Sequence, residues 1–180
     1  MRQLLILLLT IGLFSCAENK EKDSIAESEP EIETSSEITD FNLLKDFESK
    51  KTRFNSDTLE ILDHSTDGGE LIVYHDNEFD YVVMDFWLYG ETGKLNYTYW
   101  TDNDFQIKFV KKVNYEYDKP YYEEGFKVDS TTMYLSYSEP NNRLFDSEKK
   151  EITNKELVDS TRKELDEFYK DITEEIEIIK

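Results

Sequence analysis

Residues 81–117 decide the fold and read YVVMDFWLYGETGKLNYTYWTDNDFQIKFVKKVNYEY. Three runs rich in β-branched and aromatic residues alternate in polarity within this stretch, at 81–89, 95–101 and 105–117. Two short turn sequences, GETG and DND, separate the runs. Strand-forming runs joined by such turns predict an antiparallel β-meander.

The flanking segments extend this meander into an α+β domain. A hairpin is predicted from the runs 58–64 and 70–75 around STDGG, and a further strand over 131–137. Helical spacing of apolar residues predicts a short N-terminal helix over 39–51. We therefore expect an antiparallel sheet of about five to seven strands, packed by this helix and by a long C-terminal one.

The C-terminal helix is predicted over 153–178. The sequence Thr153-Asn-Lys-Glu156 matches a capping box at its start. Apolar residues then recur every three or four positions: Leu157, Thr161, Leu165, Phe168, Ile172, Ile176 and Ile179. Such a stripe is typical of a helix that packs on a sheet, and we expect the helices to cover one face. A partner helix or a dimer contact is the alternative use of this stripe.

The other face of the sheet is expected to be partly aromatic. In the first run, Val82, Met84, Phe86 and Leu88 point to the core face, because side chains alternate along a strand. Five aromatic residues are predicted to form the opposite face, as a candidate binding surface for a sugar, a peptide or a lipid: Tyr81, Trp87, Tyr89, Tyr97 and Tyr99. Burial of this face under a helix is the structural alternative.

The N-terminus has the pattern of a lipoprotein signal. Arg2 precedes an apolar run over 4–14, which is too short to span a bilayer and is typical of a secretory signal over 1–15. The sequence Leu13-Phe14-Ser15-Cys16 resembles a bacterial lipobox, which implies that Cys16 carries lipid after cleavage. Cys16 is also the only cysteine, so the chain forms no internal disulfide.

Residues 16–38 contain few large apolar residues and no aromatic ones. This segment is predicted to be a disordered acidic tether between the lipid and a single domain over 39–180. Lipid chains on Cys16 would anchor the protein to a membrane, most simply the outer membrane of a Gram-negative envelope, facing the periplasm or the cell surface.

The formal net charge of −20 excludes some partners. Nucleic acid is not expected, because proteins bind it chiefly through Lys and Arg. Acidity favours solubility, cation binding or a basic protein partner.

A second resemblance covers residues 67 to about 120. The sequence Asp67-Gly-Gly-Glu70 is followed by Tyr89-Gly-Glu-Thr-Gly-Lys94 and by an aromatic strand that ends in Phe109-Val110. This pattern is similar to uncharacterised lipoproteins of the Bacteroidota. The resemblance implies an antiparallel sheet and an envelope location, and it implies no activity.

Three motifs have possible chemistry, and each has a structural explanation. GETGK lacks the spacing of a phosphate-binding loop, so a hairpin turn with Gly93 at positive φ is expected. His64 and His75 are the only histidines, and a hairpin around residue 67 would place them several residues apart. Asp102, Asn103 and Asp104 match a turn better than a calcium loop. We therefore assign no cofactor, metal ligand or catalytic residue.

The sequence favours a membrane-anchored, non-enzymatic binding module for a protein or a small ligand. One alternative is an inhibitor or immunity-type lipoprotein whose acidic surface masks a basic partner. A second alternative is a hydrolase that uses carboxylates. A shallow aromatic groove left open by both helices would favour ligand binding, and a deep pocket with carboxylates of shifted pKa would favour the hydrolase. Nothing in the sequence specifies the ligand or the oligomeric state.

Overall fold

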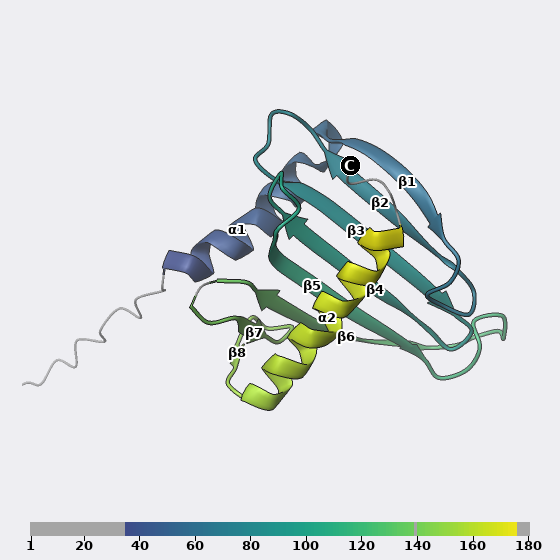
Figure 1. Ribbon diagram of the computed structural model, residues 1–180. Helices are drawn as coiled ribbons and strands as arrows, with labels where there is room; N and C mark the ends of the chain where they lie inside the picture. The colour runs from purple at the N-terminus through teal and green to yellow at the C-terminus, as the bar shows by residue number, and fades with distance from the viewer. Residues whose placement is uncertain (1–34, 139, 176–180) are drawn as a thin grey trace, which may run out of the picture. The chain divides into compact units, whose positions relative to one another are not determined.

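The computed structural model describes residues 35–138 and 140–175. One antiparallel sheet contains eight strands in sequence order (Figure 1). Its strands are β1 (Asn55–Ile61), β2 (Gly69–His75), β3 (Val82–Gly90), β4 (Gly93–Thr101), β5 (Ile107–Tyr117), β6 (Val128–Ser136), β7 (Arg143–Phe145) and β8 (Glu151–Ile152). Its helices are α1 (Ser35–Lys50), a short 3₁₀ turn η1 (Lys51–Arg53) and α2 (Lys155–Glu175).

The predicted meander is confirmed. Strands β3, β4 and β5 occupy the three alternating runs, and each pairs with the next. The sheet exceeds the predicted size because β7 and β8 contain only three and two residues. Strands this short contain no periodicity that a sequence pattern could reveal.

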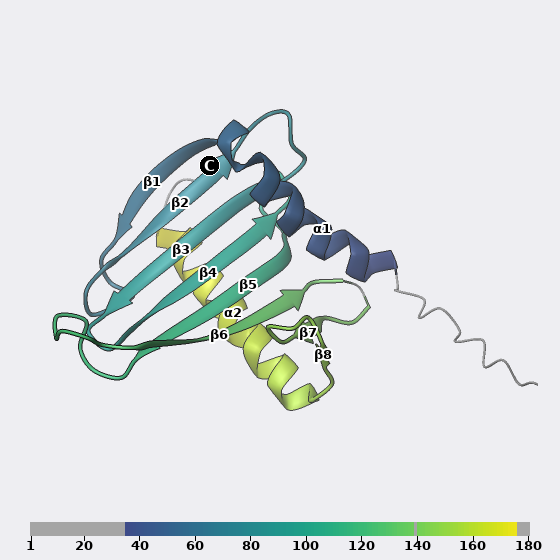
Figure 2. The same cartoon turned by 180° about the vertical axis from the view of Figure 1, so that it is seen from behind.

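The two helices lie on opposite faces of the sheet, so the expectation that they share one face is wrong. Figure 1 shows α2 across the front face, and Figure 2 shows α1 across the back. On the α2 face, Leu165 and Ile172 pack with Phe86 and Tyr99. The even-numbered residues of β3 therefore enter the core under α2, and Val83 enters a second core under α1.

The α2 face of the sheet holds its helix with tyrosine hydroxyls as well as with apolar contacts. The hydroxyl of Tyr99 donates to the backbone oxygen of Leu165 (3.0 Å), and that of Tyr97 donates to Glu164 Oε1 (2.9 Å). The helix is capped by Asn154, whose Oδ1 accepts the backbone N–H of Leu157 (3.2 Å). The expected cap at Thr153 is therefore displaced by one residue.

Helix α1 packs an aromatic core onto the other face, at one end of the strands. Leu44 and Phe47 pack with Tyr74, Trp100 and their neighbours. The helix begins at Ser35, so it includes the last residues of the predicted tether. Cys16 and the signal segment lie outside the described residues. Neither helix in the described part of the chain has the length and apolar character needed to cross a membrane.

Candidate ligand-binding site at the hairpin end

Three connections meet at the end of the sheet opposite α1. They are the β1–β2 loop (residues 62–68), the β3–β4 turn (residues 91–92) and the β5–β6 loop (residues 118–127). In an antiparallel meander alternate connections share an end, and Figure 1 shows these three together. We call this region, formed by residues 60–70, 87–95 and 114–130, the hairpin end.

Backbone hydrogen bonds join the three connections. The Tyr121 N–H donates to the Glu91 oxygen (3.0 Å), and the Tyr117 N–H donates to the Thr92 oxygen (2.9 Å). On the other side, the Tyr89 N–H donates to the Gly68 oxygen (2.9 Å). The hairpin end is therefore one connected structure rather than three separate loops.

Gly93 has a different role from the one expected. The residues with positive φ in the described part of the chain do not include it. Instead, a Cβ atom at Gly93 would lie 2.4 Å from the Tyr115 backbone oxygen. Glycine is required here because β4 and β5 approach closely, and the prediction of a positive φ at Gly93 is wrong.

Beside this turn, an ammonium group lies over two aromatic rings. Helix α1 crosses only the other end of this face of the sheet (Figure 2). At the hairpin end of the same face, the ring centres of Trp87 and Tyr115 are 6.2 Å apart, with an angle of 23° between the ring planes. The Lys94 Nζ lies 4.6 Å from the Trp87 ring centre and 4.8 Å from that of Tyr115. Both distances are within the range of cation–π attraction. We call these two rings the aromatic pair.

The aromatic pair spans a strand. Trp87 is on β3 and Tyr115 on β5, with β4 between them. Strands two apart lie about 9.5 Å from each other, so rings only 6.2 Å apart lean together over β4. On this same face, Asp85 of β3 and Asn96 of β4 are buried beside Trp87.

Next to the Trp87 ring, Asp85 accepts hydrogen bonds from three side chains. Its Oδ1 accepts hydrogen bonds from Asn96 Nδ2 (2.7 Å) and Thr98 Oγ1 (2.9 Å), and its Oδ2 accepts one from Trp87 Nε1 (3.2 Å). The Asp85 side chain thus orients the indole ring and places a carboxylate at its N–H edge.

Two adjoining hollows open beside the aromatic pair. The larger, about 620 Å³, is lined by residues 64–67, 88–95 and 114–116. The smaller, about 430 Å³, adds Tyr117 and Tyr121 and shares Tyr89 and Lys94 with the first. Lys94 therefore contacts the aromatic pair and lines both hollows.

Tyr89 closes the shared wall of these hollows. Its hydroxyl donates to Glu70 Oε1 (2.8 Å). Partial burial, followed by this hydrogen bond, raises the pKa of Tyr89 to about 12. The phenol is therefore a neutral group near physiological pH, suited to hydrogen bonding.

The five aromatic residues predicted as one binding face do not share a face. Trp87 and Tyr89 lie at the hairpin end, whereas Tyr81 on the same face packs under α1 and donates to Asp46 Oδ2 (2.9 Å). Tyr97 and Tyr99 pair with Phe86 and Met84, so they face α2. The surface as predicted is therefore wrong for three of its five members.

Sequence reasoning missed Asp85, Lys94 and Tyr115 as members of the site. The strand register would have revealed Tyr115, because it pairs directly with Lys94. Alternation of side chains predicts the strands but not how β3, β4 and β5 align, so the rings of Trp87 and Tyr115 could not be placed together from the sequence.

The other candidate motifs have structural roles. His75 pairs with Asn55 across the hairpin, and the His64 ring contacts that of Phe168 on α2. Asp102 pairs with Lys108 (2.8 Å), and that contact lowers the pKa of the carboxyl. Within the described ranges, no group of three or more His, Cys, Asp or Glu side chains is placed to hold a metal ion.

Comparison with known proteins found no matching family model, no matching curated protein and no matching solved structure. The resemblance to Bacteroidota lipoproteins stays a prediction.

Proposed function

We propose that this chain is a lipid-anchored protein of the cell envelope whose domain binds a ligand at the hairpin end without chemically converting it. Cys16 would hold the protein on the outer membrane, with the domain facing the periplasm or the cell surface. The observation that carries the proposal is the aromatic pair beside two hollows. Binding sites combine apolar walls with a few oriented polar groups. Here Tyr89, Lys94 and Tyr115 line the larger hollow, and Trp87 stacks beside Tyr115.

The anchor is tested by intact mass and fractionation of the native protein and of Cys16→Ser. The proposal predicts an acylated wild type in the membrane fraction and a soluble variant. A wild type that is unmodified at Cys16 and soluble would contradict the anchor, and the domain would then act as a secreted binding protein.

Ligand binding is tested by tryptophan fluorescence. The chain contains two tryptophans, so Trp100→Phe leaves Trp87 as the sole reporter. We would titrate this variant with chitooligosaccharides, maltooligosaccharides, a lysine-rich peptide and a glutamate-rich peptide. At least one class is expected to change Trp87 emission saturably.

Two further variants locate the binding. Tyr115→Leu should weaken it, whereas Tyr81→Phe, under α1, should leave it unchanged. The proposal fails if no class changes the emission at millimolar concentration, or if Tyr115→Leu binds as tightly as its parent. Circular dichroism of each variant confirms that it is folded.

A second candidate function is an inhibitor or immunity-type lipoprotein that masks a basic partner. The observation that favours it is the negative charge of the hairpin end, which contains ten acidic residues and three basic ones. The same peptide titrations separate this candidate from a saccharide-binding protein.

A further inference from the structure

We propose that the aromatic pair is a receptor for the ammonium group of a lysine side chain on a basic polypeptide, and that Lys94 fills it in the free protein. This inference rests on the proposed function, because it names the ligand class of the same site. Its basis is the position of Lys94 Nζ within 5 Å of both ring centres.

The geometry favours a cation over other ligand groups. Aromatic rings attract ammonium groups through the negative charge of their faces, and two rings act together on one cation. The Asp85 carboxylate, only 9 % exposed, accepts the Trp87 indole N–H at the edge of that ring and adds a negative charge beside the aromatic pair. A neutral sugar would gain nothing from this carboxylate unless it reached it directly.

Lys94 is a displaceable occupant. It stands two residues after the β3–β4 turn, where its flexible side chain lines both hollows. The side chain can therefore leave the rings for solvent without any change in the strands. A lysine from another chain could then take the same position.

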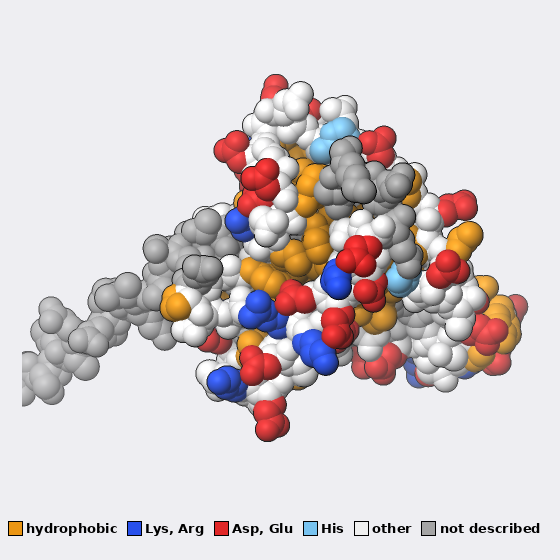
Figure 3. All heavy atoms as spheres, viewed as in Figure 1, with side chains coloured by type: hydrophobic (Ala, Val, Ile, Leu, Met, Phe, Trp, Pro, Cys, Tyr) orange, Lys and Arg blue, Asp and Glu red, His pale blue; other side chains and the backbone are white. Residues whose placement is uncertain are grey.

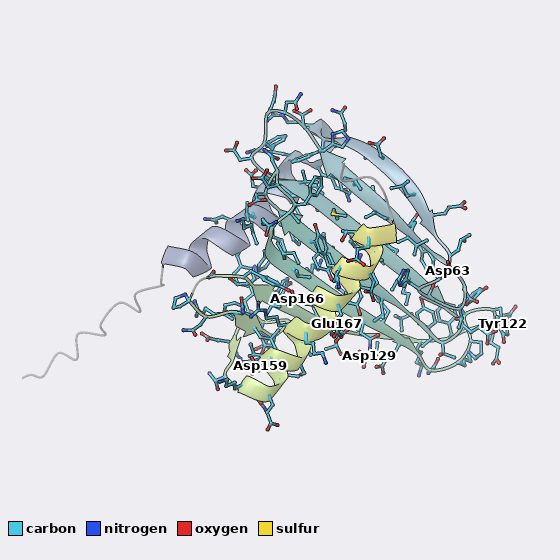
Figure 4. The ribbon with its side chains drawn as sticks, in the orientation of Figure 1. Asp63, Tyr122, Asp129, Asp159, Asp166 and Glu167 are labelled. Atoms are coloured by element: carbon cyan, nitrogen blue, oxygen red, sulfur yellow. The ribbon has the colours of Figure 1, made fainter. Side chains whose placement is uncertain are left out.

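The surroundings complement a basic partner. The hairpin end holds ten acidic residues and three basic ones, a higher ratio of acidic to basic residues than the chain's 41 to 21. Tyr121 (53 %) and Tyr122 (64 %) are exposed on the β5–β6 loop, and Tyr121 lines the smaller hollow together with Lys94. Figure 4 places Tyr122 and Asp63 at this same end, and Figure 3 shows apolar and acidic side chains together there. Tyrosines within a charged surface are typical of protein interfaces, and the charge would steer a basic segment toward them.

The test is calorimetric titration of the purified full chain with acetyl-tetralysine amide. The matched probe is the same peptide with every lysine acetylated. We expect the first to bind and the second to bind at least about tenfold more weakly, because acetylation removes the cation.

Binding by net charge alone is the competing explanation, and two variants address it. Trp87→Leu and Tyr115→Leu leave the charge unchanged but remove one ring each. Each should weaken tetralysine binding by about tenfold, the scale of one partly desolvated cation–π contact. If both variants are folded and bind tetralysine as tightly as wild type, the inference is overturned.

The role of Lys94 has its own control. Lys94→Ala should tighten tetralysine binding more than Lys127→Ala, which removes the same charge from the same end but from a side chain outside the aromatic pair. Equal effects would show that Lys94 does not compete with the ligand. If instead a saccharide changes Trp87 emission and tetralysine does not bind, the proposed function stands and the lysine inference fails.

Discussion

At the scale of single residues, Asp85 combines a carboxyl group with burial in the sheet. It is buried on a strand, and its carboxylate is held by the neutral donors Asn96, Thr98 and Trp87. Burying a carboxylate is unfavourable unless its oxygens are hydrogen-bonded. The network satisfies this requirement and, in return, orients the indole that receives the ammonium group.

Replacing Asp85 with asparagine should therefore affect both stability and the site. Asparagine would place an N–H₂ donor against a neighbouring donor whose hydrogen bond an aspartate oxygen now accepts. We therefore expect Asp85→Asn to lower the free energy of unfolding by about 1–3 kcal/mol. Urea denaturation followed by circular dichroism measures this. The control is Glu123→Gln, which changes the same charge on an exposed loop and should cost less than about 0.5 kcal/mol. Equal costs for the two variants would refute the network's contribution.

At the scale of elements, the prediction of strands succeeded where a run was long and regular. Strands β3 to β5 follow alternating sequences of about ten residues, and α2 follows its apolar stripe. Strands β7 and β8 are too short for a pattern. The assignment of α1 and α2 to opposite faces was missed because the sequence shows that a helix has an apolar side but not which face it covers.

The candidate site was predicted only in part, for a related reason. Trp87 and Tyr89 were identified because alternation along one strand places them on one face. Tyr115 and Lys94 meet Trp87 only through the register of three strands. A register shift of one residue would have moved each of them to the α2 face.

The anchoring of α2 is tested by a pair of leucine truncations. Leu165 is 1 % exposed in the core on the α2 face, whereas Leu157 is 37 % exposed near the start of the helix. Leu165→Ala should lower the free energy of unfolding by about 2–5 kcal/mol, and Leu157→Ala by under about 1 kcal/mol. Thermal or urea unfolding compares them, and a similar loss in both would contradict the observed packing of the helix.

At the scale of the whole molecule, buried tyrosines should make the fold sensitive to alkali. Burial raises the pKa of Tyr97, Tyr99 and Tyr137 above the ordinary value, and raises that of Tyr169 to about 12. The unfolded chain therefore releases phenol protons near pH 10, before the folded chain does. Stability from these groups is complete below pH 10 and is lost as pH rises toward the folded pKa values.

Urea midpoints measured from pH 8 to 11.5 should thus stay level at first and fall above about pH 10, the ordinary tyrosine pKa. Lysine ion pairs also weaken in this range, so Tyr169→Phe serves as the control. Its stability should fall less steeply with pH than that of wild type. An identical slope in the two proteins would show that Tyr169 does not contribute to the loss.

At this scale the molecule combines an acidic domain with a proposed lipid anchor and a proposed site for a cation. That site depends on the position of the Lys94 ammonium group over the aromatic pair. Proton NMR of the Lys94 ε-methylene, assigned by comparison with Lys94→Ala, tests this claim most directly. Because the ammonium lies over two rings, their ring currents should shift this signal upfield in the free protein. Saturation with acetyl-tetralysine amide should return it toward the position of a solvated lysine. A signal at the solvated position in the free protein, or one that stays upfield at saturation, would contradict the account.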